Sequence, residues 1–339
     1  MKHEGKLLFL NEKTVKKYLT RTIVLDLVEQ AFSEYAEGFV VNPVKLSLPM
    51  NPTYEGYINS MPAYLTRFGV AGMKSVSVFK DNMKDYQLPV TVGSIILNDP
   101  ETGIPYSFMD GTHITALRTG ASVAVMAKYL AAKGAEVVTI IGSGAQGLSS
   151  FVMIKSVLPK IKEVRVVDIN PEAQERFIEE ASAVFPDVDY IKLSDIQSAS
   201  TGSNIIVGAA TSKVPLLANI DYDDGTTVLC IEEDITNRFA GKFDHTIVDF
   251  TECFIERTNI LGNEHAKETG DAYEEITEET ITGEIGDIII NKISGRINEK
   301  DKILASPVGM GATDIIVADY VYKKALEASD GMVLDFLDS

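Results

Sequence analysis

The segment from Glu136 to Gly147 constrains this chain more than any other. It reads EVVTIIGSGAQG, so a β-branched strand pattern leads into a complete G-x-G-x-x-G, and a helical pattern follows. Gly142 permits the tight turn after the strand, Gly144 permits close approach of the backbone to phosphates, and Gly147 permits close packing of the helix on the sheet. The amide-rich start of that helix favours an anion, so the segment predicts a site for a dinucleotide pyrophosphate. The residues expected to line this site are Gly142, Ser143, Gly144, Ala145 and Gln146.

A second strand pattern, Glu163–Val167, ends at Asp168, 26 residues beyond Gly142. This spacing is close to the roughly 20 residues expected for the acid that binds the adenosine ribose. A carboxylate there accepts hydrogen bonds from the ribose 2′-hydroxyl and repels a 2′-phosphate, which predicts NAD rather than NADP. An ordinary strand–helix–strand crossover with a glycine turn and no ligand is the alternative, and the complete context of the motif favours the nucleotide.

The patterns along the chain predict an α/β protein of two domains, as the length of 339 residues also suggests. Strands and helices alternate over residues 137–248, which is typical of a Rossmann-like, doubly wound parallel sheet. Before about residue 110, strand patterns joined by Pro-, Gly- and Asn-rich turns indicate an antiparallel sheet with a helical layer, including one long helix over residues 14–37. A final helix over residues 314–327 is expected to pack on this first domain. We therefore predict an NAD-binding domain of residues 115–312 and an α+β substrate domain of residues 1–114 together with 313–339.

Composition narrows the possible partners. The chain has 31 basic and 49 acidic residues and a formal net charge of −18, which disfavours nucleic acid and anionic membranes. No apolar run reaches the roughly 20 residues of a membrane span, and the first residues lack a signal-peptide core, so we expect a soluble, cytoplasmic protein. The four histidines lack metal-ligand spacing and predict no metal site. Cys230 and Cys253 are expected to be buried, reduced thiols.

Three cations interrupt otherwise apolar patterns. Lys45 lies within residues 44–48, Lys74 within residues 72–78 and Arg118 within residues 114–120. An unpaired buried charge is costly, so a cation in an apolar element is usually paired or functional. Each one alone could equally be a surface residue whose stem covers apolar neighbours. Three of them beside a dinucleotide fold predict a binding site for a carboxylate substrate.

Two further segments hold small or acidic residues after predicted strands, and a third segment is a glycine-rich loop that opens the last predicted helix. The turn 209–212 is expected near a cofactor ribose, the acidic loop 232–234 near the nicotinamide, and the glycine-rich loop 306–311 is expected to close over the cofactor. An acidic loop is most often simply solvated, and a glycine-rich loop can merely begin a helix. The cofactor contacts predicted from these segments are Ala210, Thr211, Ser212 and Gly309.

Taken together, these motifs resemble the ornithine cyclodeaminase/mu-crystallin family. The similarity covers nearly the whole chain, and it extends well beyond the glycines that a generic dinucleotide-binding enzyme would share. The segments that carry it are residues 61–65 (MPAYL), 72–74 (GMK), 114–121 (ITALRTGA), 127–131 (AKYLA) and 142–146 (GSGAQ). The family includes ornithine and lysine cyclodeaminases, certain alanine dehydrogenases, ketimine and pyrroline-carboxylate reductases, and dehydrogenases that make or split N-linked amino-acid conjugates.

The resemblance implies a homodimer in which the first domain supplies the substrate contacts and the dimer sheet. It also implies roles for individual residues. Lys74 and Arg118 would bind the substrate carboxylate, with Lys74 among the catalytic residues. Arg118 and Thr119 would approach the cofactor phosphates, and Asp234 would be the acid/base near the substrate nitrogen.

Three positions depart from the family pattern. Lys45 stands where the family often has arginine, which would give single-point rather than forked carboxylate binding. The loop around Asp234 lacks the usual Gly-x-Asp followed by Pro-Gly-Lys, which leaves Arg238 as the expected cofactor-side contact. Asn59 stands where ornithine-specific members carry a glutamate, which argues against ornithine as the substrate.

Our leading hypothesis is an NAD-dependent amino-acid dehydrogenase or imino-acid reductase that transfers hydride between Cα and the nicotinamide. The first alternative is ornithine cyclodeaminase, in which NAD is recycled within each turnover. The second alternative is a non-catalytic binder of small molecules, of the mu-crystallin type.

Overall fold

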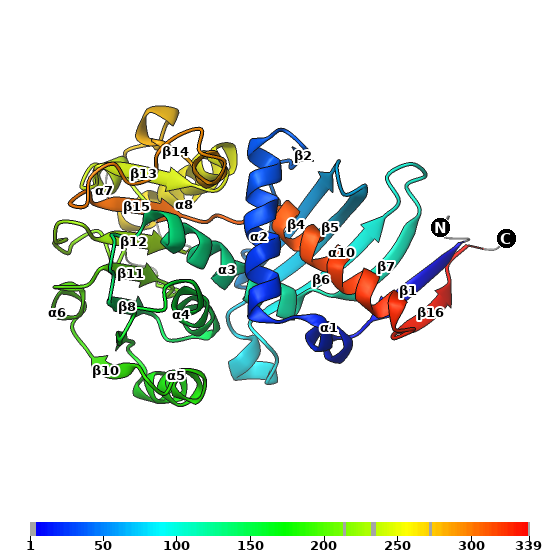
Figure 1. The fold of residues 1–339 in the computed structure, drawn as a ribbon, viewed down its shortest axis with the longest axis horizontal. Coiled ribbons are helices and arrows are strands. Elements are labelled where there is room, and N and C mark those ends of the chain that lie inside the picture. Colours follow the sequence, from blue (N-terminus) through cyan, green and yellow to red (C-terminus); the bar gives the residue numbers. More distant parts are fainter. Residues whose placement is uncertain (1–4, 213–214, 232–234, 271–272, 338–339) are drawn as a thin grey trace. The chain divides into compact units, whose positions relative to one another are not determined.

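The computed structural model describes residues 5–212, 215–231, 235–270 and 273–337 (Figure 1). The chain forms two compact units, one of residues 1–118 with 310–339 and the other of residues 119–309. The first division falls within helix α3 (Thr112–Leu130) and the second just before helix α10 (Gly311–Glu327). These points lie a few residues from the expected boundaries at 114 and 312.

The first unit contains an eight-stranded mixed sheet in the order β16-β1-β7-β6-β5-β4-β2, with β3 also paired to β4. Its neighbouring strands are antiparallel except β1 and β7, which are parallel. The strands are β1 (Lys6–Leu10), β2 (Val40–Val41), β3 (Leu46–Pro49), β4 (Gly56–Leu65), β5 (Val70–Phe79), β6 (Thr91–Asn98), β7 (Pro105–Asp110) and β16 (Met332–Asp335). The sequence does not predict β7 or β16, because β7 begins at a proline without clean alternation and β16 is exposed throughout.

Helices α1 (Glu12–Tyr18) and α2 (Arg21–Ala36) accompany this sheet, together with a π-helical turn over Asn82–Tyr86. The sequence predicts one continuous helix over residues 14–37, and this prediction is wrong, because the structure has two helices there. The backbone is extended at Leu19 and Thr20, and the Thr20 side chain accepts a hydrogen bond from the Ile23 N–H at 3.4 Å, which starts a new helix.

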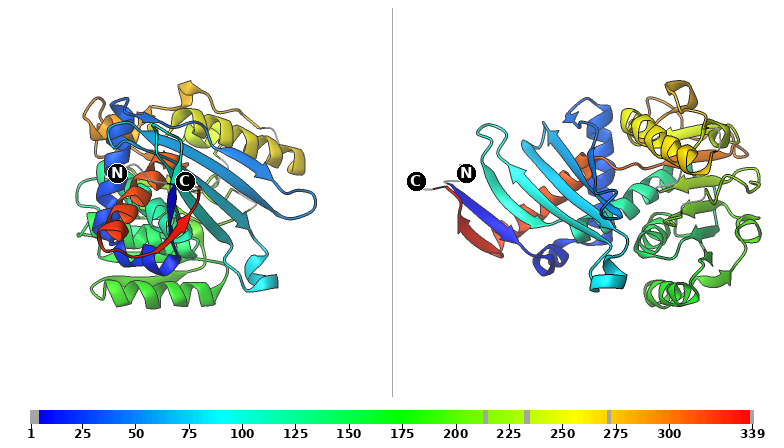
Figure 2. Two further views of the ribbon diagram at one scale, coloured as in Figure 1. Left: turned by 90° about the vertical axis from the view of Figure 1, so that its right-hand side faces the viewer. Right: turned by 180° about the vertical axis from the view of Figure 1, so that it is seen from behind.

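Helix α10 packs against one face of β4, β5 and β6 and against α2 (Figure 2). Its start is fixed on β4 by two features. A Cβ at Gly311 would lie 2.8 Å from the Met61 carbonyl oxygen, so only glycine permits this approach. The Asn42 Oδ1 accepts a hydrogen bond from the Ala312 N–H at 3.0 Å and thereby caps the first turn. The first turn of α10 is therefore held firmly above the sheet.

The second unit contains an eight-stranded sheet in the order β10-β9-β8-β11-β12-β15-β13-β14, parallel throughout, which confirms the Rossmann-like prediction (Figure 1). Its strands are β8 (Val137–Ile141), β9 (Glu163–Val167), β10 (Asp189–Leu193), β11 (Ile205–Gly208), β12 (Thr227–Cys230), β13 (His245–Val248), β14 (Gly283–Glu284) and β15 (Ile303–Ser306). Its helices are α4 (Ala145–Val157), α5 (Pro171–Val184), α6 (Ile196–Ser200), α7 (Asn237–Ala240), α8 (Thr251–Thr269) and α9 (Ile285–Ile289), with a 3-10 turn at Glu278–Thr280. Cys230 and Cys253 are both buried and free.

Within the described parts of the chain, no helix combines the length and apolarity needed to cross a bilayer.

Candidate functional site

A buried ionic cluster in the first unit joins three elements that are distant in sequence. Lys74 projects from β5, Arg118 from α3 and Asp314 from the first turn of α10. Lys74 Nζ lies 2.7 Å from Asp314 Oδ2, and Arg118 Nε donates to Asp314 Oδ1 at 2.9 Å. The Lys74 and Asp314 side chains are fully buried, and that of Arg118 is 8% exposed. The structure therefore brings together two of the three predicted carboxylate-binding cations around one acid.

The cluster carries more positive than negative charge. The pKa of Lys74 is lowered from 10.5 to about 7: burial is the largest cause, the Arg118 charge acts in the same direction, and Asp314 opposes both effects. The charge of Lys45 also acts to lower this pKa, and it is the smallest of these contributions. One carboxylate thus pairs with two cations, and an incoming carboxylate would balance the excess positive charge.

Two atoms of the cluster keep hydrogen-bonding capacity. Lys74 Nζ and Asp314 Oδ2 are at ion-pair distance, yet neither makes a well-directed hydrogen bond with any described residue. Buried polar groups are normally satisfied, and exceptions are frequent where a ligand binds. An ammonium with three donors, fully buried beside one carboxylate, suits a further carboxylate oxygen.

Asp314 is the residue that sequence reasoning missed at this site. The motif GATDIIVADYV surrounds it with apolar residues, and an acid in the first turn of an otherwise buried helix was the available signal. Lys45 also differs from the expectation, because β3 begins at Leu46 and Lys45 lies just before the strand rather than inside it.

The glycine turn of the second unit has the features that its sequence predicts. Gly142 follows β8 with φ +95°, and a Cβ there would lie 2.5 Å from the Ala210 nitrogen. A Cβ at Gly147 would lie 2.0 Å from the Gly142 carbonyl oxygen, so α4 packs directly on the turn. Gly144 is the N-cap of α4 and has no side chain to occupy the first-turn amides, and both Gly144 and Ala145 are exposed. The residues present fit a pyrophosphate held by backbone N–H groups.

Asp168 lies directly beside this turn. Its Oδ2 accepts hydrogen bonds from the Ser143 N–H and hydroxyl, both at 2.8 Å, and its Oδ1 accepts from the Asn170 N–H at 2.9 Å. The carboxylate therefore ties the glycine turn to the end of β9. A carboxylate offers about four acceptor positions, so capacity for a ribose hydroxyl remains.

Other predicted cofactor contacts are placed around the same turn. The close approach of Gly142 to Ala210 brings the turn containing Thr211 and Ser212 beside the glycine loop. Thr119 lies next to Gly120 on α3. A Cβ at Gly120 would lie 2.3 Å from Ser149 Oγ of α4, so this part of α3 packs closely against α4, the helix that begins at the glycine turn. Gln146, in the first turn of α4, has a buried Oε1 that accepts no hydrogen bond from the described residues.

The loop that contains Gly309 is held by a second acid that sequence reasoning missed. Asp249 follows β13, is almost fully buried, and accepts hydrogen bonds from the Val308 N–H at 2.9 Å and the Gly309 N–H at 2.8 Å. Gly309 has φ +87°, which favours glycine. An acid directly after a β-branched strand was the available signal, because Asp168 occupies the same position after β9.

The roles of two predicted site residues stay predictions. Asp234, with its neighbours Glu232 and Glu233, lies outside the described residues. Arg238 is exposed on the short helix α7, and its predicted contact with the cofactor stays a prediction. Among the described residues, no group of three or more His, Cys, Asp or Glu is placed to hold a metal ion.

Comparisons with known proteins agree with this arrangement. A model of the ornithine cyclodeaminase/mu-crystallin family matches residues 6–329. Alanine dehydrogenase from Archaeoglobus fulgidus is 29% identical over 97% of this chain and 98% of its own. The structure of Thermococcus litoralis Δ1-pyrroline-2-carboxylate reductase in complex with NADH and L-proline superposes with a TM-score of 0.86, at 30% identity over 96% of this chain and 99% of that one. An archaeal alanine dehydrogenase dimer with bound NAD gives the same TM-score at 27% identity, covering 98% of this chain and all of that one.

Proposed function

Because the chain belongs to the ornithine cyclodeaminase/mu-crystallin family, we propose that it is an NAD-dependent oxidoreductase acting on the Cα–N bond of a small amino or imino acid. The observation that carries this proposal is the buried cluster of Lys74, Arg118 and Asp314, which has an excess of positive charge and an ammonium with unused hydrogen-bonding capacity. Relatives named for alanine, pyrroline-carboxylate and ketimine chemistry support the same class of substrate.

The cluster binds and orients the substrate. The Lys74 ammonium takes one oxygen of the substrate carboxylate, and Arg118 and Lys45 add positive charge on the same group. Asp314 holds the two cations in place, because each is paired to a different oxygen of its carboxylate. Fixing the carboxylate in this way restricts the direction in which Cα presents its hydrogen, which is a substantial part of catalysis in a reaction between two bound molecules.

Proton transfer accompanies the redox step. In the oxidative direction the α-ammonium loses a proton, and Cα then loses its hydrogen with both bonding electrons, which leaves an iminium ion; loss of a second proton gives the neutral imine. Asp234 is the base implied by the family resemblance.

The second unit is proposed to hold NAD through the turn Gly142–Gly147, with Asp168 at the ribose hydroxyls. Bound NAD supplies the two-electron oxidant, or NADH the reductant. Asp168 disfavours a 2′-phosphate by charge, so turnover with NADP at the same rate would contradict its proposed role.

The experiment measures reduced-nicotinamide absorbance with purified full-length protein, NAD and a panel of amino acids, and in reverse with NADH, 2-oxo acids and amines. Net NADH formation supports the proposal, whereas ammonia release without it would indicate cyclodeamination.

Lys74→Met is expected to lower kcat/KM by about 10²–10³-fold, since truncating one partner of a buried charge pair costs about 2–5 kcal/mol. Lys80→Met is the matched control, because Lys80 follows the same strand and is exposed.

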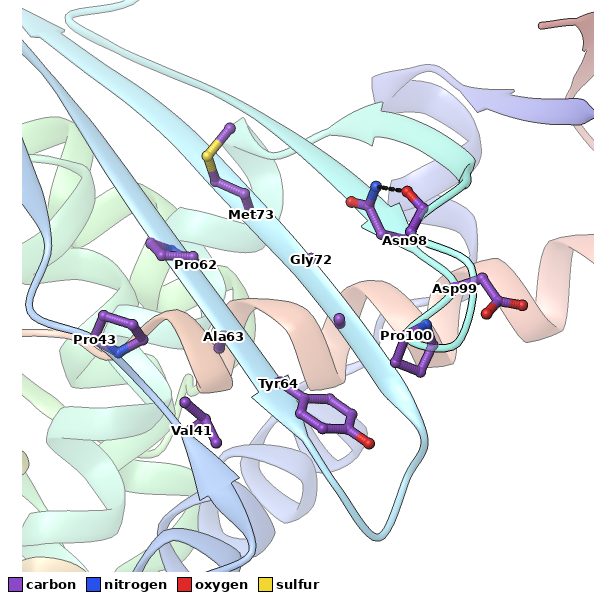
Figure 3. A pocket seen from close by; sticks show the side chains of 12 residues that line it. Val41, Pro43, Pro62, Ala63, Tyr64, Gly72, Met73, Asn98, Asp99 and Pro100 are labelled. Atoms are coloured by element: carbon purple, nitrogen blue, oxygen red, sulfur yellow. Dashed lines mark hydrogen bonds between the residues drawn. The ribbon is translucent and has the colours of Figure 1, made fainter. Parts of the chain in front are cut away.

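The first unit is also proposed to form a homodimer through the face of its sheet opposite α10. On that face an unbroken row of apolar side chains crosses six strands. The row consists of Pro62, Met73, Ile96, Phe108, Phe9 and Met332. Figure 3 shows Pro62 and Met73 on this face beside a pocket that Pro43, Tyr64 and Asn98 also line. Large exposed apolar patches usually mark interaction surfaces, and a related archaeal alanine dehydrogenase is a dimer.

Sedimentation velocity tests the dimer. Phe108, 38% exposed at the centre of the row, is replaced by aspartate, and the variant is expected to sediment as a monomer at concentrations where the parent protein is a dimer. Ile297→Asp is the control, because Ile297 is exposed in the second unit. A monomeric parent protein, or a dimeric Phe108→Asp variant, would contradict the proposal.

A further inference from the structure

The chain passes between its two units at two places. The first lies inside helix α3, between Arg118 and Thr119, and the second lies between Gly309 and Met310. Helix α3 is continuous through its boundary, and continuous helices usually curve only gently. A larger change in the direction of the chain is therefore expected at the second connection, where the backbone lies between β15 and α10.

The second unit holds the chain as far as Gly309. β15 ends at Ser306, whose hydroxyl donates to the Cys230 carbonyl oxygen at 3.2 Å. Beyond the strand, the N–H groups of Val308 and Gly309 donate to the two carboxylate oxygens of Asp249 at 2.9 and 2.8 Å. Asp249 is only 1% exposed, and hydrogen bonds to a carboxylate buried from water are strong. The backbone is thus anchored up to the Gly309 nitrogen.

The first unit holds the chain from the carbonyl group of Met310 onward. The Met310 carbonyl oxygen accepts a hydrogen bond from the Thr313 hydroxyl at 2.8 Å. The Ala312 N–H donates to Asn42 Oδ1 at 3.0 Å. A Cβ on Gly311 would lie 2.8 Å from carbonyl oxygens of β4, so the backbone of Gly311 rests directly on that strand. The start of α10 is thus anchored to its own unit.

The two sets of contacts leave a pivot of two residues, Gly309 and Met310. The bonds that can rotate between the anchors are those described by φ and ψ of these residues. Gly309 has φ +87°, and glycine exchanges between positive and negative φ at little cost. The Met310 side chain is buried, and methionine adapts to changes of packing more readily than other apolar residues. Hinges consist of a few such residues that absorb large changes in φ and ψ.

We propose that Gly309 and Met310 form a hinge between the two units, and that Asp249 and Asn42 are positioning residues that confine the movement to this hinge. The inference rests on the proposed oxidoreductase function, because the turn proposed to hold NAD belongs to the second unit and the ionic cluster belongs to the first. Hydride transfer requires Cα and the nicotinamide to be aligned, and a misplacement of about 1 Å can cost about 10²-fold in rate. A short, anchored hinge restricts the ways in which the two reactants can meet.

The kinetic test lengthens the hinge from the side of the second unit. Asp249→Ala releases the N–H groups of Val308 and Gly309, so the pivot extends back toward Ser306. The kcat of the variant is expected to fall by at least about tenfold, because alignment rather than binding is lost. The Kd of NAD without substrate and the KM of the amino acid are expected to change by less than about threefold, since each ligand keeps its own site.

A pair of variants lengthens the hinge from the side of the first unit. Asn42→Ala removes the acceptor for the Ala312 N–H and is expected to lower kcat. Asn42→Asp keeps a side-chain acceptor of the same length, and aspartate caps helices as well as asparagine does. It is therefore expected to retain the kcat of the parent protein. This pair also tests the hinge if Asp249→Ala does not fold.

Asp301→Ala is the matched control. Asp301 also accepts backbone hydrogen bonds in the second unit, from the N–H groups of Ile297 and Asn298 at 3.2 and 2.7 Å. It lies before β15, whereas the hinge follows that strand. Its replacement is expected to lower the melting temperature, as Asp249→Ala does, and to leave kcat unchanged.

A second measurement does not depend on turnover. Cysteines that replace Ile297 in the second unit and Leu326 in the first are spin-labelled, since both positions are exposed and the natural Cys230 and Cys253 are buried. Dilution with excess unlabelled protein restricts the measured distances to pairs within one chain. Pulsed electron resonance is expected to give a broader distance distribution in Asp249→Ala than in the parent protein or in Asp301→Ala.

The outcomes separate the two proposals. Absence of NAD-linked turnover together with the broader distribution would overturn the oxidoreductase function and leave the hinge supported. An unchanged distribution in Asp249→Ala would overturn the hinge whatever the activity. A loss of NAD affinity that accounts for the whole loss of activity would show instead that Asp249 only supports a cofactor-binding loop, and equal losses of kcat in Asp249→Ala and Asp301→Ala would assign it a purely structural role.

Discussion

The glycine turn of the second unit and the ionic cluster of the first unit are both arranged to receive negative charge, but they are built differently. The turn uses backbone amides and close packing within one contiguous stretch, Gly142–Gly147, with Asp168 as its neighbour. The cluster uses three side chains, Lys74, Arg118 and Asp314, from three elements far apart in the chain. The turn therefore depends on the absence of side-chain atoms, and the cluster depends on a balance of buried charges.

The largest change in the free energy of unfolding is expected when the negative charge of Asp314 is removed. Asp314→Asn leaves the buried cations Lys74 and Arg118 without their shared carboxylate, and the free energy of unfolding is expected to fall by about 3–5 kcal/mol. The loss should be smaller at pH 9 than at pH 6, because at pH 9 Lys74 is uncharged. Denaturant unfolding at the two pH values measures both effects.

Asp319→Asn is the control for this prediction. Asp319 is also buried in α10, but its partner Lys323 is 54% exposed and can be solvated when the acid is removed. Its loss is expected to cost about 1 kcal/mol or less. Equal losses in the two variants would show that the cluster has no special energetic role.

The same contrast explains how much of the molecule the sequence predicts. The β8–turn–α4 segment and Asp168 could be predicted because their function depends on local order and on spacing over a few tens of residues. Lys74 and Arg118 could be suspected as charges in apolar patterns. Their partner Asp314 could not be assigned to them, because it lies 196 residues beyond Arg118 and meets it only through the packing of α10 on the sheet.

The sequence pattern also fails to predict some short elements, for a related reason. The strand β15 (Ile303–Ser306) lies between β12 and β13, yet its four buried residues are too few to show a period. In the sequence, Asp249 is likewise only an acid after a β-branched run, although it fixes the Gly309 loop in the structure. In both cases the tertiary neighbours, rather than the local pattern, determine the role.

A second prediction perturbs the turn. Gly142→Ala forces a side chain into a position with φ +95° and within 2.5 Å of the Ala210 backbone. The combined strain and overpacking are expected to cost about 2–4 kcal/mol and to abolish NAD binding in calorimetry. Gly134→Ala has a similar φ of +80° with open space around it, so it is expected to cost only about 1–2 kcal/mol and to leave NAD affinity unchanged. An NAD affinity unchanged in Gly142→Ala would argue against this turn as the pyrophosphate site.

The smallest effect is a pH dependence that only the cluster should show. The pKa of Lys74 lies near 7 in the folded protein, below its unfolded value of 10.5. Between these two values the unfolded chain binds more protons than the folded chain. The contribution of Lys74 to the free energy of unfolding therefore rises with pH across that window. Its carboxylate-binding ammonium is lost over the same range. With substrate below saturation, kcat/KM is therefore expected to fall by up to about tenfold per pH unit above pH 7, since this ratio reports the free enzyme.

Arginine stays protonated throughout, so Lys74→Arg should remove this decline even if its activity is lower at every pH. A decline that persists unchanged in Lys74→Arg would place the titrating group elsewhere. The glycine turn should contribute nothing to the decline, because backbone amides do not titrate in this range.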